Sequence, residues 1–171
     1  MTERPLIIAT GLEFVNKGLR ATKPVMDSLI KNADDKIHML VYRFGDPSLL
    51  EPIEEKVYRG VKLCIVVDRL FDTGRDGELL QPQEVQDKLL ELNKQKHVTL
   101  ASFREQPRGF LHAKVIVADR REMIVGSANF SKNGMDNSYE IGFHVEGIEC
   151  QKIADVIEDL SQDTKLVDVV P

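Results

Sequence analysis

A run of eight residues, VKLCIVVD from Val61 to Asp68, constrains the fold of this chain more than any other stretch. Its nearly continuous apolar character is typical of a β-strand that is covered on both faces. Helical and strand patterns alternate around it, with strands predicted at 5–10, 36–44 and 97–103 and helices at 22–33, 46–60 and 82–95. This alternation predicts an α/β fold in which neighbouring strands are parallel.

The second half of the chain instead contains strands that follow one another directly. Residues 109–131 have the pattern of a hairpin that turns near 118–123, and residues 138–147 form a third strand. A helix over 149–163 closes the pattern. We therefore expect a mixed β-sheet flanked by helices, a sandwich in which parallel and antiparallel pairs coexist. The length and the 42% hydrophobic content suit one domain over residues 1–171.

The charge of the chain is unevenly distributed. Residues 146–171 carry seven acidic and two basic side chains, which account for the whole net charge of −5. We assign this acidity to the solvated face of the C-terminal helix at 149–163. The remaining residues are neutral overall, so charge neither predicts nor excludes a nucleic acid as binding partner.

No segment of the sequence approaches the ~18 apolar residues of a membrane span. The N-terminal residues MTERPLIIATG lack a basic region followed by a long apolar stretch. We expect a cytoplasmic protein without stable membrane association.

Polar side chains interrupt the apolar hairpin in a regular way. His112 and Lys114 alternate with apolar residues and share one face of the first strand, while Ser127 and Asn129 share a face of the second. We expect the opposite face, with Ala113, Val115 and Val117, to pack on the core. A lysine, an amide, a hydroxyl and an imidazole that can attack phosphorus together suit a phosphate site. No cluster of metal ligands accompanies them in the sequence, so we predict no metal and no cofactor.

The spacing His112-x-Lys114-x4-Asp119-x6-Gly126-Ser127-x-Asn129 closely resembles the signature of the phospholipase D superfamily. Six fixed residues at these positions would arise by chance in about one in 10⁵ to 10⁶ chains of this length. Downstream, Glu140 occupies the place of a glutamate that supports the histidine in that family.

The resemblance implies specific roles for these residues. His112 is the nucleophile that forms a covalent phosphohistidine, and Lys114 assists it. Lys114, Ser127 and Asn129 bind the phosphate, and Glu140 orients the imidazole. We assign structural roles to Asp119, at the turn, and Gly126, which carries no side chain.

The family builds one active site from two motifs, and this chain contains one motif. The resemblance therefore implies a homodimer with the site on its two-fold axis. Twofold symmetry is also the commonest arrangement of small oligomers.

Three classes of function remain open from the sequence. The first is a metal-independent nuclease acting on DNA or RNA, since small family members with one motif are often nucleases; a narrow dimeric groove favours single strands. The second is a phospholipid phosphodiesterase or phosphatidyl transferase. The third is a non-catalytic dimeric module of a larger complex.

Several basic residues bear on the choice of substrate. Arg43, Arg69 and Arg108 either contact a phosphate backbone or form surface salt bridges. For a nuclease we expect the basic residues to gather around the site, namely Arg43, Arg69, Arg104, Arg108, Lys114 and Lys132. The weak overall charge also suggests that a partner protein delivers the substrate.

Overall fold

The computed structural model describes residues 4–104, 106 and 109–171. Within this part of the chain one sheet contains nine strands: β1 (Leu6–Thr10), β2 (Arg20–Ala21), β3 (Lys36–Val41), β4 (Lys62–Asp68), β5 (Val98–Phe103), β6 (Lys114–Ala118), β7 (Glu122–Gly126), β8 (Glu140–Glu146) and β9 (Val167–Val169). The helices are α1 (Leu12–Val15), α2 (Thr22–Asn32), α3 (Glu51–Tyr58), α4 (Gln83–Asn93) and α5 (Ile148–Gln162), with a 3₁₀ turn η1 (Pro47–Leu50) and a π-helical turn η2 (Asn133–Asn137).

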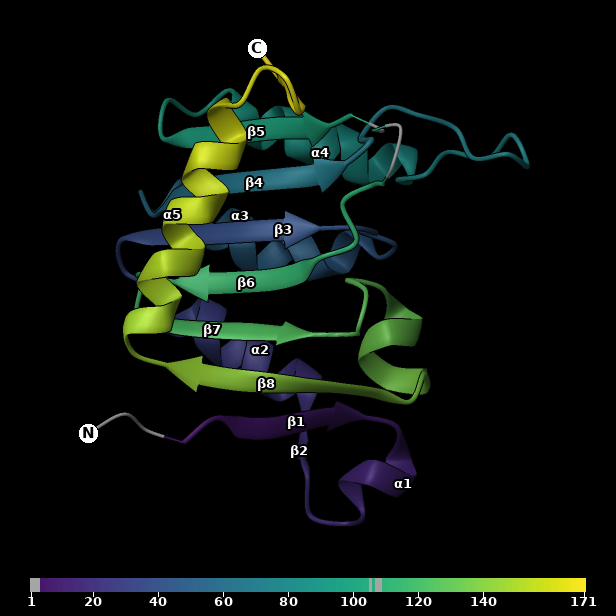
Figure 1. Cartoon of the computed structure of the whole chain (residues 1–171), viewed down its shortest axis with the longest axis vertical. Coiled ribbons are helices and arrows are strands. Elements are labelled where there is room, and N and C mark those ends of the chain that lie inside the picture. The colour runs from purple at the N-terminus through teal and green to yellow at the C-terminus, as the bar shows by residue number, and fades with distance from the viewer. Residues whose placement is uncertain (1–3, 105, 107–108) are drawn as a thin grey trace.

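The strands lie in the order β2-β1-β8-β7-β6-β3-β4-β5-β9 (Figure 1). β3, β4 and β5 are parallel, whereas β6, β7, β8 and β1 alternate in direction. The predicted mixed sheet flanked by helices is confirmed. β3, β4, β5 and β7 finish at the same end of the sheet at which β6 and β8 begin, on the right in Figure 1. We call this the motif end.

Helices cover both faces of the sheet. α5 crosses one face, and α2, α3 and α4 lie on the other (Figure 1). On β6, Val115 and Val117 pack in the core under α5, while Ile116 is fully buried in the larger core on the other side. The prediction that the face with Ala113, Val115 and Val117 packs on a core is confirmed. The opposite face is buried as well, because a second layer of helices covers it.

The acidic C-terminal helix forms as predicted, displaced by one residue at each end. Cys150, Ala154 and Ile157 recur every three or four residues and are buried. Asp155 and Asp159 are exposed on its outer side, which explains the acidity of this region. In the part of the chain that is described, no helix is long and apolar enough to cross a membrane.

Four short elements, α1, β2, η2 and β9, were not predicted from the sequence. Each contains two to five residues. Such segments are too short to show a hydrophobic period, and β9 exists through pairing with β5.

Candidate active site

All the residues of the motif except Asp119 lie at the motif end of the sheet. β6 begins at Lys114, β7 ends at Gly126 and β8 begins at Glu140. His112 lies two residues before β6, and Ser127 and Asn129 follow β7 in the adjoining loop instead of lying on the strand as predicted. Three adjacent strands of alternating direction thus bring segments from 112 to 140 together.

The imidazole of His112 is exposed and is supported by aromatic rings. Its centroid lies 4.4 Å from the Tyr42 ring and 5.6 Å from the Phe110 ring. No hydrogen bond from a described residue occupies either ring nitrogen. Both nitrogens are therefore available to a substrate or to a second protein chain.

Lys114 is almost fully buried, with 7% of its surface exposed. Its ammonium donates to the carbonyl oxygen of His112 over 2.7 Å and lies 4.7 Å from the centre of the Tyr42 ring. Burial lowers the pKa of Lys114; the negative charge of Glu140 opposes this shift and the positive charge of Arg43 adds to it. The Lys114 cation is thus held at a fixed place beside the backbone of His112.

Glu140 binds a different partner from the one that the resemblance implied. Its carboxylate accepts a hydrogen bond from the Ser127 hydroxyl, and Ser127 Oγ also accepts from the backbone N–H of Ile141 over 3.2 Å. Among the described residues no hydrogen bond joins Glu140 to His112. Within one chain, Glu140 orients Ser127 and adds negative charge near Lys114.

Asn129 has unused hydrogen-bonding capacity at the site. Its side-chain oxygen is buried without a hydrogen-bond partner in the described part of the chain. The loop that carries it is tied to the segment after β3, since Phe130 N–H donates to the Arg43 carbonyl over 3.1 Å and Gly45 N–H to the Phe130 carbonyl over 2.8 Å. Buried polar atoms that lack a partner are uncommon and recur at functional positions.

Gly134 holds this loop in place and was not predicted from the sequence. A Cβ atom there would lie 2.3 Å from the backbone oxygen of Asn129. Only glycine lets the π-helical turn approach the Asn129 segment so closely.

Asp119 and Gly126 occupy structural positions. The Asp119 carboxylate lies at the opposite end of the sheet from His112, where it accepts hydrogen bonds from the backbone N–H groups of Asp34, Asp35 and Lys36. Burial tends to raise the pKa of Asp119, but these donors outweigh it and lower the pKa. Gly126 brings β7 and β8 together, as a Cβ atom there would meet Gly142 Cα at 2.8 Å.

A buried carboxylate that the sequence analysis did not select organises the other side of the site. Asp68, fully buried at the end of β4, binds Arg43 over 3.2 Å and Arg69 over 3.0 Å. It also accepts the backbone N–H of Leu111, next to His112, over 3.0 Å. The sequence contained a signal for Asp68, because it is a polar residue that ends an apolar strand. The carboxyl ends of parallel strands are where ligands often bind.

The basic residues are only partly gathered at the site. Arg43 lies 4.1 Å over the Tyr42 ring and Arg69 lies 5.5 Å over the Phe110 ring, so both adjoin the surroundings of His112. Lys132 is exposed three residues after Asn129. Arg104 follows β5 at the same end of the sheet, but it binds Asp168 of β9, at the edge of the sheet, over 3.5 Å. Arg108 lies outside the described residues.

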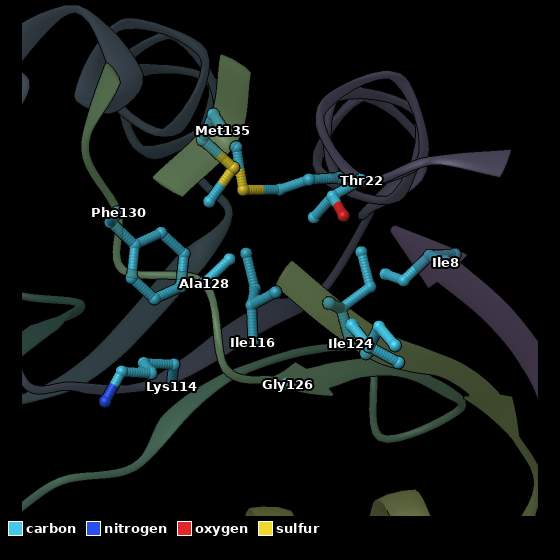
Figure 2. Close-up of a pocket in the computed structure, with 12 residues that line it drawn as sticks. Ile8, Thr22, Lys114, Ile116, Ile124, Gly126, Ala128, Phe130 and Met135 are labelled. Atoms are coloured by element: carbon cyan, nitrogen blue, oxygen red, sulfur yellow. The ribbon is translucent and has the colours of Figure 1, made fainter. Parts of the chain in front are cut away.

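A small apolar cavity of about 20 Å³ lies behind the site, between α2 and the sheet (Figure 2). Figure 2 shows the Lys114 amine pointing away from the cluster formed by Met135, Ile116 and Ile124. This volume holds about one water molecule. The cavity is therefore a packing gap beneath the site, and a phosphodiester has to bind outside it.

One cluster among the described residues has the composition of a metal site. The ligand atoms of Glu122, His144 and Glu146 lie within 4.8 Å of one another. They occupy the opposite ends of β7 and β8 from Ser127 and Glu140. Within the described chain, the candidate metal ligands are therefore separate from the motif.

Comparison with known proteins agrees with the fold. A family model described as cardiolipin synthase, PLD-like domain, matches residues 26–162. DISARM protein DrmC of Bacillus paralicheniformis is 32% identical over 155 residues, covering 90% of this chain and 61% of that protein. The chain thus spans less than two thirds of that relative.

Two solved structures share the architecture at low identity. Nuc, a phospholipase D family member from Salmonella typhimurium, has a TM-score of 0.69 and 21% identity over 98% of this chain and 99% of that chain. NucT from Helicobacter pylori has a TM-score of 0.68 and 18% identity over 91% and 95%. The family model covers most of the sequence, and the matched segment includes every residue of the motif, from His112 to Asn129. The chain therefore belongs to the family of phospholipase D-like domains.

Proposed function

We propose that this protein is a metal-independent nuclease whose active site forms between two copies of the chain. The observation that carries the proposal is the convergence of His112, Lys114, Ser127 and Asn129 at the motif end of one sheet. The exposed side chain of His112 leaves an imidazole available for a ligand. The chain matches Nuc over nearly the full length of both proteins, which supports a comparison with a family member of similar size.

The proposed reaction has two displacement steps. A ring nitrogen of His112 attacks phosphorus, a nitrogen–phosphorus bond forms, and the bond to the leaving oxygen breaks. His112 of the second copy donates a proton to that oxygen. Water, deprotonated by the same second imidazole, then attacks phosphorus and breaks the nitrogen–phosphorus bond. The product carries the phosphate, and both histidines return to their starting states.

The other groups of the site stabilise the charge of the phosphate and hold the side chains around it in position. The two Lys114 ammonium groups stabilise the non-bridging phosphate oxygens, and Asn129 supplies an amide donor. Glu140 orients the Ser127 hydroxyl. The two histidines begin in opposite protonation states, so activity follows a bell-shaped pH curve whose two apparent pKa values belong to the pair.

The first test measures cleavage of labelled single-stranded DNA, duplex DNA and RNA in excess EDTA, beside a phospholipid substrate. We expect cleavage of nucleic acid that persists in EDTA and disappears in His112→Ala. Turnover of the phospholipid alone would assign the protein to lipid chemistry. A stable dimer without any turnover would indicate a non-catalytic module or a required partner protein.

The second test asks whether two His112 side chains serve one site. Wild-type and His112→Ala chains are unfolded together, refolded as a mixture and assayed at constant total concentration. If each site needs both histidines, an equal mixture keeps about a quarter of wild-type activity, whereas independent subunits keep about half. An activity proportional to the wild-type fraction would overturn the shared site.

A further inference from the structure

Phe110 is an exposed aromatic residue directly beside the proposed nucleophile. It retains 47% of its surface in solvent, two residues before His112. Its ring meets the His112 ring edge-on, with 5.6 Å between centroids and 87° between planes. A planar group that contacts Phe110 is therefore also next to the imidazole.

Aromatic rings and guanidinium groups surround Phe110 on the protein side. Tyr42 lies 5.5 Å away, the Arg69 guanidinium carbon lies 5.5 Å over the Phe110 ring, and Arg43 lies 4.1 Å over Tyr42. We call Tyr42, Phe110, Arg43 and Arg69 the aromatic–arginine surface. Asp68 holds both arginines, and its third bond, to the Leu111 N–H, fixes the residue between Phe110 and His112.

We infer that Phe110 stacks on a nucleobase adjacent to the scissile phosphate, and that the substrate class is single-stranded nucleic acid. This inference rests on the proposed nuclease function. Rings that stack on bases, interleaved with cations that follow the phosphates, are the usual means of binding single strands without sequence preference. The aromatic–arginine surface combines both kinds of group within contact of His112.

Stacking on Phe110 selects against duplex substrates for a simple physical reason. In a duplex both faces of each base are already covered by neighbouring bases, and the edges are paired. A base must leave the helix before an aromatic side chain can cover its face, which costs free energy. A single strand offers its bases without that cost, so the same ring discriminates between the two forms.

The chain contains no tryptophan, which allows a direct spectroscopic test. Phe110→Trp in a His112→Ala background places one fluorophore at the surface and prevents cleavage. We expect (dT)12 to quench its fluorescence, and a 12-mer of the same backbone without bases to leave it unchanged. The matched control is Tyr58→Trp in the same background, because Tyr58 is 59% exposed at the end of α3, away from the motif end.

The affinities supply a second measurement at fixed salt concentration. We expect His112→Ala protein to bind (dT)12 more tightly than either the base-free 12-mer or a 12-base-pair duplex. Adding Phe110→Leu, which keeps an apolar side chain but removes the ring, should weaken (dT)12 binding about 5- to 100-fold. Binding of the base-free 12-mer should not change, and Phe110→Tyr should restore the preference.

The outcomes separate this inference from the proposed function. Equal binding of (dT)12 and the base-free 12-mer, with no effect of Phe110→Leu, would overturn base stacking while the nuclease activity stands. Base stacking would also be overturned if Phe110→Leu weakened the binding of (dT)12 and of the base-free 12-mer to the same extent. Failure to bind any of the nucleic acids, together with no cleavage by wild-type protein, would overturn the proposed function and this inference with it.

Discussion

The backbone N–H of Leu111 donates to the buried carboxylate of Asp68 over 3.0 Å, which fixes the residue next to His112 to the end of β4. The same carboxylate binds Arg43 and Arg69. One side chain therefore positions the proposed nucleophile's segment and two cations near it. A small displacement of a reacting group can cost about 10²-fold in rate.

Asp68→Asn tests this arrangement. We expect the free energy of unfolding to fall by about 1.5–3 kcal/mol, because hydrogen bonds to a charged acceptor are weakened and two guanidinium groups lose their counter-charge. The value of kcat should fall at least tenfold in folded protein. Urea denaturation and steady-state assays measure the two effects. Asp159→Asn, on the exposed side of α5, is the control and should change stability by less than about 0.5 kcal/mol.

Lys114→Met tests the role of the buried ammonium. We expect kcat to fall about 10²- to 10³-fold, since a charge aimed at the developing negative charge of the transition state is lost. Burial lowers the pKa of Lys114 below 10.5, so the folded state disfavours its charged form. Raising the pH towards 10.5 should then stabilise wild-type protein relative to the variant. Equal pH dependence of unfolding in both proteins would contradict this assignment.

Gly126→Ala tests the close approach of β7 and β8. The added Cβ would lie 2.8 Å from Gly142 Cα and 3.0 Å from the Ile141 carbonyl oxygen. We expect a loss of about 1–3 kcal/mol in stability and reduced activity, because Ser127 moves relative to Glu140. Gly109→Ala is the matched control, since a Cβ there meets no atom of the described residues within 4 Å. Similar losses in both variants would show that the strand contact is not the cause.

Glu158→Gln tests a charged contact under α5. Hydrogen bonds from Lys36 first, and then from the buried His38, lower the pKa of Glu158 from 4.5 to about 2. A lowered carboxyl pKa contributes stability that is complete above 4.5 and is lost as the pH falls towards 2. Wild-type protein should be more stable than the variant at pH 7 and lose that advantage by pH 2. Urea midpoints of both proteins between pH 7 and pH 2 measure this stability difference. A difference that stays the same at every pH would refute the prediction.

The sequence predicted the architecture because the signals that encode it are local. The apolar run at 61–68 became β4, and the periodic segments at 22–33 and 82–95 became α2 and α4 within a few residues at their ends. Gly60, predicted to end the second helix, has a φ of +97°, which suits a residue without a side chain. Each of these patterns depends only on residues that are close in the sequence, within one helix or one strand.

The partners of the motif residues could not be predicted in the same way. The contact of Asp68 with Leu111 joins residues 43 positions apart, and that of Ser127 with Glu140 depends on the pairing of β7 and β8. Within one chain Glu140 binds Ser127, and its support of the His112 imidazole in a dimer stays a prediction. The ion pair of Arg104 with Asp168 likewise depends on the pairing of β5 with β9.

The mixed α/β sheet and the side chains of the motif could be predicted from the sequence, because periodicity and spacing are properties of the chain. The tertiary structure was needed to show that both faces of β6 are buried, that Tyr42 and Phe110 flank His112, and that Asp68 holds two arginines beside it. These contacts depend on which strands become neighbours, and strand order is set by the packing of the whole sheet between its helices.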